Sequence, residues 1–288
     1  MKKKQNPSAL RIVGKYNITE KVLINTLAIL LLLLVIFPFY WIILTSFKTP
    51  FEIYEVPPKF YPTRLSLFNY IDAFKNYQIG LFSINSLIVT ISTVAGTTIA
   101  SALAAYAIAR LTFFGSKHIQ ALLAASQMFP VVVLLVPLFI FCVRLNLYDS
   151  HLSLILPYIA IQTPVSIILQ INYFKDIPIE LEDAARIDGC STFQTFTKIM
   201  LPLVVSGIVA VSIYTFIQIW QEFLISSSFI TTRELFTLTV GLTTFKGEYA
   251  TEWGALMATS VVIALPAMIL FTTSQDFFIN RLAGGVKE

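Results

Sequence analysis

The chain has 288 residues, of which 56% are hydrophobic and only 12% are charged, and its mean hydropathy is +0.77. Ordinary soluble domains carry about 25% charged residues, so this composition excludes a water-soluble globular fold and indicates a membrane protein. The net charge of +4 requires no nucleic-acid partner, because basic residues at a membrane surface meet anionic lipid headgroups.

Six apolar runs are long enough to cross a hydrocarbon core of about 30 Å, which takes about 20 helical residues. They cover Val22–Leu44, Ile84–Ala109, Ile119–Val143, Leu152–Phe174, Leu203–Ile225 and Leu256–Phe277. The third and fourth runs are interrupted by Pro130, Pro137, Pro157 and Pro164. Membrane helices tolerate proline when neighbouring groups satisfy the freed carbonyls, so we expect kinks or local unwinding there. The sequence predicts an all-α integral membrane fold with six transmembrane helices.

The first run follows a long basic segment, and no small-residue cleavage site comes after it, so we interpret it as a retained span rather than a signal peptide. The expected organisation is an N-terminal segment 1–21, a transmembrane domain 22–278 and a tail 279–288. Most of the 20 lysines and arginines then lie on the side of the N-terminus. The positive-inside rule places both termini, and the loop 176–202, in the cytoplasm.

The charged loop 176–202 stands between two apolar runs and carries helix signals of its own. Pro178 suits a first helical turn, and the acidic residues that follow it suit the positive end of a helix dipole. Gly189 can adopt the left-handed conformation that ends a helix, and Ser191–Gln194 has the form of a capping box. We expect a helix, a sharp turn and a second short helix, with Leu201-Pro202 leading into the fifth span.

One face of the first helix in this loop is small and charged. At about 100° per residue, the positions that share it are Glu182, Ala185, Arg186 and Gly189. This face is typical of a docking surface, in which small residues allow close approach and charged ones fix the register. The alternative is an amphipathic helix resting on lipid headgroups, although such helices usually have more lysine and more large apolar residues.

Polar residues inside the spans are candidates to line a pathway, because they are costly in lipid and usually face an interior cavity. The candidates are Gln127, Gln162, Gln218, Trp220 and Glu222. The glutamines are equally open to a second interpretation, as hydrogen-bonding groups between helices. We interpret Asn85, Ser86 and Thr97 as packing residues. The sequence has no cluster with metal-ligand spacing and no phosphate-binding loop, so we expect neither a metal site nor nucleotide hydrolysis in this chain.

The stretch Glu182-Asp-Ala-Ala-Arg-Ile-Asp-Gly189, followed by Ile199-Met-Leu-Pro202, resembles the Glu-Ala-Ala loop of the membrane subunits of binding-protein-dependent ABC importers. Further stretches resemble the maltose-type sugar permeases and their smaller, six-span subunit. They are Met128-Phe-Pro130, Leu147–Pro157, Trp220-Gln-Glu-Phe223, Leu238–Leu242, Trp253–Ala258 and the tail Gln275–Lys287. Asp183, Cys190 and Gln221 depart from the usual pattern, and the departure at Gln221 puts carried-over solute preferences in doubt.

The resemblance implies a type I ABC importer permease fold with a cytoplasmic coupling helix between helices 4 and 5, in a bacterial cytoplasmic (inner) membrane. It implies three protein partners: a second homologous permease, a dimer of ABC ATPase subunits and an extracellular solute-binding protein. ATP and magnesium would belong to the ATPase, and no cofactor to this chain. The residues implied to couple the chain to the ATPase are Glu182, Asp183, Ala184, Ala185, Arg186 and Gly189.

Two other function classes are less compatible with the residues. A secondary carrier would need ionisable residues in mid-span or inverted repeats with broken helices, yet the spans hold no central Asp, Lys or Arg. An intramembrane enzyme would need a catalytic constellation at depth, and none is apparent. Within the importer class we expect an oligosaccharide or other sugar, with a polyol, glycerol phosphate or uronate as the alternative solute.

Overall fold

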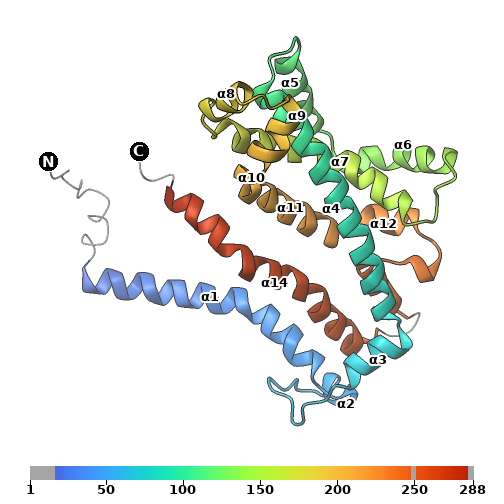
Figure 1. The fold of residues 1–288 in the computed structure, drawn as a ribbon. Helices are drawn as coiled ribbons and strands as arrows, with labels where there is room; N and C mark the ends of the chain where they lie inside the picture. The colour runs from blue at the N-terminus through green and yellow to red at the C-terminus, as the bar shows by residue number, and fades with distance from the viewer. Residues whose placement is uncertain (1–16, 248–250, 285–288) are drawn as a thin grey trace. The chain divides into compact units, whose positions relative to one another are not determined.

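The computed structural model describes residues 17–247 and 251–284, and almost all of its regular structure is helical (Figure 1). The expectations for residues 1–16 and 285–288 lie outside the described residues. The longer helices are α1 (Ile18–Ser46), α3 (Phe68–Asn76), α4 (Ile79–Arg110), α5 (Ser116–Ser126), α6 (Val131–Arg144), α7 (Leu152–Lys175), α8 (Glu180–Ile187), α11 (Val205–Trp220) and α14 (Trp253–Gly284). Short ones are α2 (Pro50–Ile53), α9 (Thr192–Thr195), α10 (Leu201–Leu203), α12 (Leu224–Phe229) and α13 (Leu238–Gly241).

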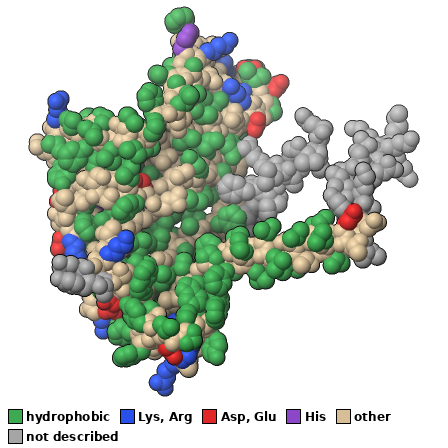
Figure 2. Space-filling model, turned by 180° about the vertical axis from the view of Figure 1, so that it is seen from behind, with side chains coloured by type: hydrophobic (Ala, Val, Ile, Leu, Met, Phe, Trp, Pro, Cys, Tyr) green, Lys and Arg blue, Asp and Glu red, His purple; other side chains and the backbone are tan. Residues whose placement is uncertain are grey.

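The chain forms two compact units, and the first consists of the described residues up to 70 together with 253–261. Its helix α1 exposes apolar side chains on all sides from Val22 to Phe39, and it is the apolar rod in Figure 2. A helix that is apolar all round is suited to lipid or to another protein rather than to water. At the end of α1, the buried Lys48 ammonium donates to the Lys59 carbonyl at 2.6 Å and lies 4.5 Å from the Trp41 ring centre.

Glu52 closes the short connection after α1. Hydrogen bonds from the Thr63 hydroxyl, and then from the Thr49 and Thr63 amides, lower the pKa of the Glu52 carboxyl to about 2. Asn69 adds hydrogen bonds to the carbonyls of Ser46 and Lys48, at 3.0 and 2.8 Å. The segment 47–67 is therefore held by local polar contacts rather than by an apolar core.

The second unit, built from 71–252 and 262–284 where described, is organised around the pairing of α4 with α7, against which α11 also packs. One apolar cluster lies near the C-terminal end of α4 and includes Ala105, Phe174 and Met200. Another lies toward its N-terminal end and includes Val89, Leu154 and Phe229. Between them α4 buries small polar residues, at Thr90, Thr93, Thr97 and Ser101. Small side chains of this kind let membrane helices approach closely.

Four helices are long and apolar enough to cross a membrane in the described part of the chain, and there are six spans if each of two bent helix pairs counts as one. The first, second, fourth and sixth predicted spans are confirmed as continuous helices. Pro157 and Pro164 do not interrupt α7, so the expected unwinding does not occur there.

The third and fifth predicted spans are broken or shorter than expected. The third is divided at Gln127–Pro130 into α5 and α6, which meet at 101°, because proline lacks an amide and disfavours helix in the residue before it. The fifth was expected to reach Ile225 but α11 ends at Trp220. A separate helix, α12, begins beyond it, where the Glu222 carboxylate accepts the amides of Ile225 and Ser226 at 2.8 and 3.1 Å.

A close approach between α7 and α11 depends on Gly207. A Cβ atom at this position would lie 2.1 Å from the Tyr173 ring, whereas one at Gly80 would lie an ordinary 3.4 Å from Phe74. We expect Gly207→Ala to lower the free energy of unfolding by about 1–3 kcal/mol, the usual cost of overpacking. Gly80→Ala, the control, should leave stability unchanged or raise it, because alanine favours helix by about 1 kcal/mol. Thermal unfolding of the detergent-solubilised chain measures both, and equal midpoints would contradict the packing argument.

Candidate functional site

The helix predicted in the charged loop is present as α8, although it begins at Glu180, so Pro178 precedes the helix and does not lie in its first turn. Three acidic residues occupy its first turn. At its C-terminal end Gly189 has φ +83°, and the amides of Gly189 and Cys190 bond to the carbonyls of Arg186 and Ala185 at 3.1 and 3.0 Å. This is a Schellman closure, which needs the left-handed conformation that glycine adopts without strain. The predicted capping box is also confirmed, since Ser191 and Gln194 exchange hydrogen bonds at 2.9 and 3.3 Å.

The Glu182 carboxylate connects α8 to the C-terminal end of α4. Its side chain is 2% exposed and accepts a hydrogen bond from the Tyr106 hydroxyl at 2.8 Å. The Arg110 guanidinium lies 3.9 Å from the same carboxylate, and the Arg186 guanidinium donates to it at 3.2 Å. A buried carboxylate is stable only when it is paired in this way, and removal of one partner typically costs about 3–5 kcal/mol.

Arg110 also binds the end of α7. Its guanidinium donates to the carbonyls of Phe174, at 2.6 Å, and of Ile177. These are carbonyls at a helix C-terminus, where a cation is favoured by the helix dipole. Arg110 therefore joins three elements, α4, α7 and α8. We call Tyr106, Arg110 and Glu182 the α4–α8 clamp.

The burial of Glu182 decides which side of α8 faces outward. Ala185 is also buried, so these two of the six residues that we expected to contact a partner face the chain's own bundle instead. The opposite side of the helix is exposed, and it carries Glu180, Asp183, Ala184 and Ile187. Ile187 is 86% exposed. We call these four residues the outer face of α8. Arg186 and Gly189 are exposed at its border.

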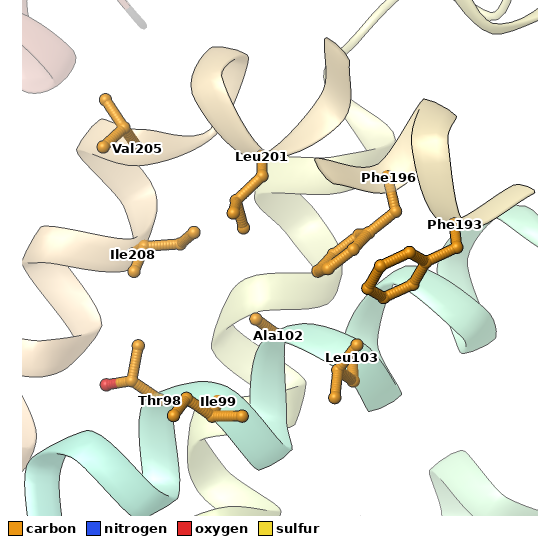
Figure 3. A pocket seen from close by; sticks show the side chains of 9 residues that line it. All are labelled: Thr98, Ile99, Ala102, Leu103, Phe193, Phe196, Leu201, Val205 and Ile208. Atoms are coloured by element: carbon orange, nitrogen blue, oxygen red, sulfur yellow. The ribbon is translucent and has the colours of Figure 1, made fainter. Parts of the chain in front are cut away.

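An irregular, bent segment, which we call the joint, follows α8 and α9. Residues Phe196–Met200 form a π-helical turn, α10 contains Pro202, and the helix axis turns by 76° before α11. Beside this joint lies a cavity of about 440 Å³ (Figure 3). Figure 3 shows Phe193 and Phe196 pointing from the joint toward α4, and the full lining is Thr98, Ile99, Ala102, Leu103, Phe193, Phe196, Leu201, Val205 and Ile208. The lining is almost wholly hydrocarbon, and the Thr98 hydroxyl already bonds to Ser212 at 2.9 Å.

The three glutamines predicted for a pathway lie in different surroundings. Gln127 is exposed at the break between α5 and α6 and donates to Ser126 at 3.4 Å. Gln162 on α7 and Gln218 on α11 are partly buried. Neither of these two amides has a hydrogen-bond partner among the described residues. They do not form the interhelical hydrogen bonds that the alternative interpretation required within this chain.

Trp220 and Glu222 are occupied within the protein. The Trp220 indole is 5% exposed, stacks on Phe216 at 5.6 Å and donates to the Ile263 carbonyl of α14 at 2.9 Å. The Glu222 carboxylate accepts the Tyr158 hydroxyl in addition to the two amides at the start of α12. The structure therefore gives both side chains packing and capping contacts, in contrast to the expectation that they meet a solute.

The sequence analysis did not single out Tyr106 or Arg110 as functional residues. Tyr106 and Arg110 lie four residues apart near the end of a span, and helix positions with that spacing are neighbours on one face.

The N-terminal end of α4 also makes contacts that the sequence analysis did not predict, since it interpreted Asn85 and Ser86 only as packing residues. Asn85 donates to the carbonyls of Glu234 and Phe236, at 2.7 and 3.0 Å, and the Ser86 hydroxyl accepts the Leu238 amide at 2.7 Å.

No group of three or more His, Cys, Asp or Glu side chains is placed to hold a metal ion in the described ranges 17–247 and 251–284. Outside the spans, the Asp149 carboxylate also joins two segments that are distant in sequence. Burial alone would raise the pKa of its carboxyl, but hydrogen bonds from the Thr232 hydroxyl and from the amides of Thr232 and Thr231 lower it to about 2. Asp149 thus fixes the connection before α7 to the segment after α12.

Residues 96–284 match the profile of the family described as "Binding-protein-dependent transport system inner membrane component". The chain is 39% identical over 253 residues to the sulfoquinovosyl glycerol transport system permease protein SmoH of Agrobacterium fabrum, covering 88% of this chain and 89% of that one. It is 30% identical to the trehalose/maltose transport system permease protein MalG of Thermococcus litoralis, and the alignment covers 93% of this chain and 97% of that one.

The fold is similar to that of a chain in a bacterial ABC transporter involved in the import of the acidic polysaccharide alginate. The TM-score is 0.80 at 20% identity, and the superposition covers 91% of this chain and 99% of the other. At that identity the likeness concerns the fold, and it agrees with the predicted permease fold.

The conformation of Gly189, rather than its size, limits what this position accepts. No atom lies within 4 Å of a Cβ placed there, so a side chain meets backbone strain and no clash. We expect Gly189→Val to destabilise the end of α8 by about 1–2 kcal/mol, the cost of a left-handed conformation for an ordinary residue. Gly189→Asn should cost less, because asparagine tolerates that conformation. Hydrogen–deuterium exchange across 180–195 measures the effect, and equal exchange in the two variants would refute it.

Proposed function

Because the chain belongs to the family of binding-protein-dependent transport system inner membrane components, we propose that it is the permease subunit of an ATP-driven importer for a carbohydrate, with an oligosaccharide as the first choice. It is a multi-pass membrane transport subunit. The single observation that carries the proposal is the outer face of α8, a helix surface that is exposed in the part of the chain that the structure describes.

The outer face of α8 supports docking to a separate ATPase. It combines an exposed apolar side chain, Ile187, with the acidic residues Glu180 and Asp183 around the small Ala184. A groove with an apolar floor and basic rim complements such a surface, since charge complementarity gives specificity and burial gives affinity. A helix that rested on headgroups would present lysines there instead. ATP and magnesium would be bound by that partner, a dimer of ABC ATPase subunits.

The importer would have three further properties. The side that carries α8 is cytoplasmic, as the distribution of lysine and arginine favours, and both termini lie on that side. A second, homologous permease completes the pathway, and an extracellular binding protein delivers the solute. The apolar exposure of α1 supports burial against lipid or that companion.

A carbohydrate is the solute class that the comparisons support. Two relatives are described as permeases for sulfoquinovosyl glycerol and for trehalose/maltose, and the structural neighbour belongs to an alginate importer. The amides of Gln162 and Gln218 offer both donors and acceptors, which suit sugar hydroxyls. A strongly anionic solute would require Arg or Lys in the pathway, and the spans of this subunit lack them in their centres. A polyol, glycerol phosphate or uronate is the alternative, with the companion supplying the charge.

The decisive experiment is to purify the chain with its native partners, to identify them, and to reconstitute the assembly in vesicles. A panel of sugars, polyols and uronates, each offered with the purified binding protein, is then screened for stimulated ATP hydrolysis and for uptake. We expect a di- or oligosaccharide to stimulate both activities. Absence of an ATPase from the assembly would refute the proposed function, and stimulation by a non-carbohydrate alone would refute the solute class.

Docking through the outer face of α8 predicts that Ile187→Glu weakens binding of the ATPase. Loss of one buried isoleucine contact is worth about 2 kcal/mol, or roughly 30-fold in affinity. Thr192→Glu is the matched control, because it adds the same charge to an exposed position of the same loop, at the start of α9. Co-purification of the ATPase with each variant is the measurement. Equal recovery with both variants would exclude this face as the docking surface.

The pathway proposal predicts opposite effects for Gln162 and Trp220. Gln162→Ala should raise the KM of uptake by about 2- to 10-fold, the value of one hydrogen bond, without lowering the thermal midpoint. Trp220→Phe should lower the midpoint, because it removes the bond to Ile263, and should leave KM unchanged. Uptake kinetics and thermal unfolding on the same preparations distinguish the two roles. The reverse pattern would assign the solute contact to Trp220.

A further inference from the structure

Two routes lead from α8 to the bundle, and they differ in stiffness. The covalent route passes through the π-helical turn at Phe196–Met200, the Pro202 segment and a 76° bend before it reaches α11. π-Helical turns are rare and are frequently found at functional sites. The 440 Å³ cavity beside this joint (Figure 3) leaves its side chains room to repack. A displacement of α8 would be absorbed along this route.

The second route is the α4–α8 clamp, and it is stiff. The Glu182 carboxylate is held by the Tyr106 hydroxyl and by two guanidinium groups, and its burial makes separation from them costly. The Tyr106 ring is itself fixed by Phe174 and Phe196, with ring centres 5.7 and 5.1 Å away. Movement of α8 therefore has to carry the adjoining end of α4 with it.

Helix α4 is a suitable rod for such a movement. It has 32 residues, which correspond to about 48 Å at 1.5 Å per residue. It contains no proline, whereas α1, α6, α7 and α14 each contain at least one. Proline is a common cause of helix kinks, so α4 is the least interrupted of the long helices.

The far end of α4 holds a second segment. Asn85 and Ser86 bond to the backbone of residues 234–238, and Phe82 packs on Phe236 with ring centres 5.9 Å apart. The α13 backbone lies so close that a Cβ at Gly241 would be 2.4 Å from the Phe82 ring. We call residues 233–245 the far segment. Figure 1 shows α8 at one end of α4 and α3 at the other.

We infer that Tyr106, Arg110 and Glu182 are positioning residues that make α4 a transmission rod between α8 and the far segment. Displacement of α8 shifts α4 through the clamp, and Asn85 and Ser86 move the far segment with it. This inference rests on the proposed function, because it requires an ATPase that displaces α8. In the proposed orientation the far segment lies on the outer side, where the binding protein would dock, so the rod couples the two sides of the membrane.

The test uses the assembly of the full chain with its co-purified partners in nanodiscs, and the probe is MgATP with vanadate. Hydrogen–deuterium exchange is followed in peptides covering 180–195 and 233–245. In the wild type, the probe is expected to change exchange in both. In the variants Tyr106→Phe and Asn85→Ala, MgATP with vanadate should still change the hydrogen–deuterium exchange of peptides covering 180–195. The change in hydrogen–deuterium exchange of peptides covering 233–245 should become at least about fivefold smaller than in the wild type, which is the lower end of ordinary coupling between sites.

Tyr148→Phe is the control, because it removes one tyrosine hydroxyl, as Tyr106→Phe does, but at a position away from the clamp. Tyr148 is 38% exposed and its ring contacts Phe139. It should leave both responses intact. A response in 233–245 that persists in Tyr106→Phe and Asn85→Ala would overturn the inference while leaving the docking proposal standing. An assembly without an ATPase would refute the proposed function and the inference together. If Tyr106→Phe does not fold, Asn85→Ala decides, since it cuts the rod at its other end.

Discussion

The burial of one carboxylate, that of Glu182, sets the geometry of the whole charged loop. A carboxylate that is 2% exposed has to be paired, and its partners Tyr106 and Arg110 come from a different helix. Once these contacts form, α8 can rotate very little about its own axis. The identity of its exposed face, with Ile187 and Asp183, follows from that restriction. A surface offered to another protein is thus defined by a contact made inside this one.

The rest of the bundle shows why such a contact is needed. Apolar packing between membrane helices is weakly directional, since lipid tails are as apolar as the side chains they would replace. The centre of α4 pairs with α7 through small polar residues, of which Ser101 accepts a hydrogen bond from Gln170 at 3.0 Å. Its two ends are fixed by Arg110 and by Asn85, each bonded to backbone carbonyls of other segments. Polar contacts therefore determine the register in a protein whose bulk is hydrocarbon.

Features that depend on neighbours in sequence could be predicted, whereas those that depend on distant partners could not. The C-terminal end of α8, the left-handed Gly189 and the Ser191 cap arise from residues within a few positions, and the structure confirms them, whereas Pro178 lies two residues before α8 and not in its first turn. Two residues of the predicted docking face, Glu182 and Ala185, are buried, and the burial of Glu182 could not be foreseen because its partner Tyr106 lies 76 positions away. The burial of Trp220 could not be predicted for the same reason, because its indole donates to the carbonyl of Ile263, 43 positions further along the chain. The end of α11 was misplaced because Glu222 starts a new helix that hydropathy cannot distinguish.

The charged α4–α8 clamp fixes the position of α8 along α4 more strictly than an apolar contact of equal area would. Apolar surfaces can slide past each other by a helical turn at little cost, because one methyl group replaces another. One turn before Tyr106, α4 carries the apolar residues Ala102 and Leu103, and Arg110 is its last residue, so a shift by one turn would not restore both partners of the Glu182 carboxylate. Slippage would separate the buried Glu182 carboxylate from Tyr106 and Arg110 and leave Arg186 as its partner, which is more costly than the loss of a few van der Waals contacts. The ion pair contributes little net stability by comparison, and we interpret its role as fixing one register, so that a stroke at α8 is passed on without slip.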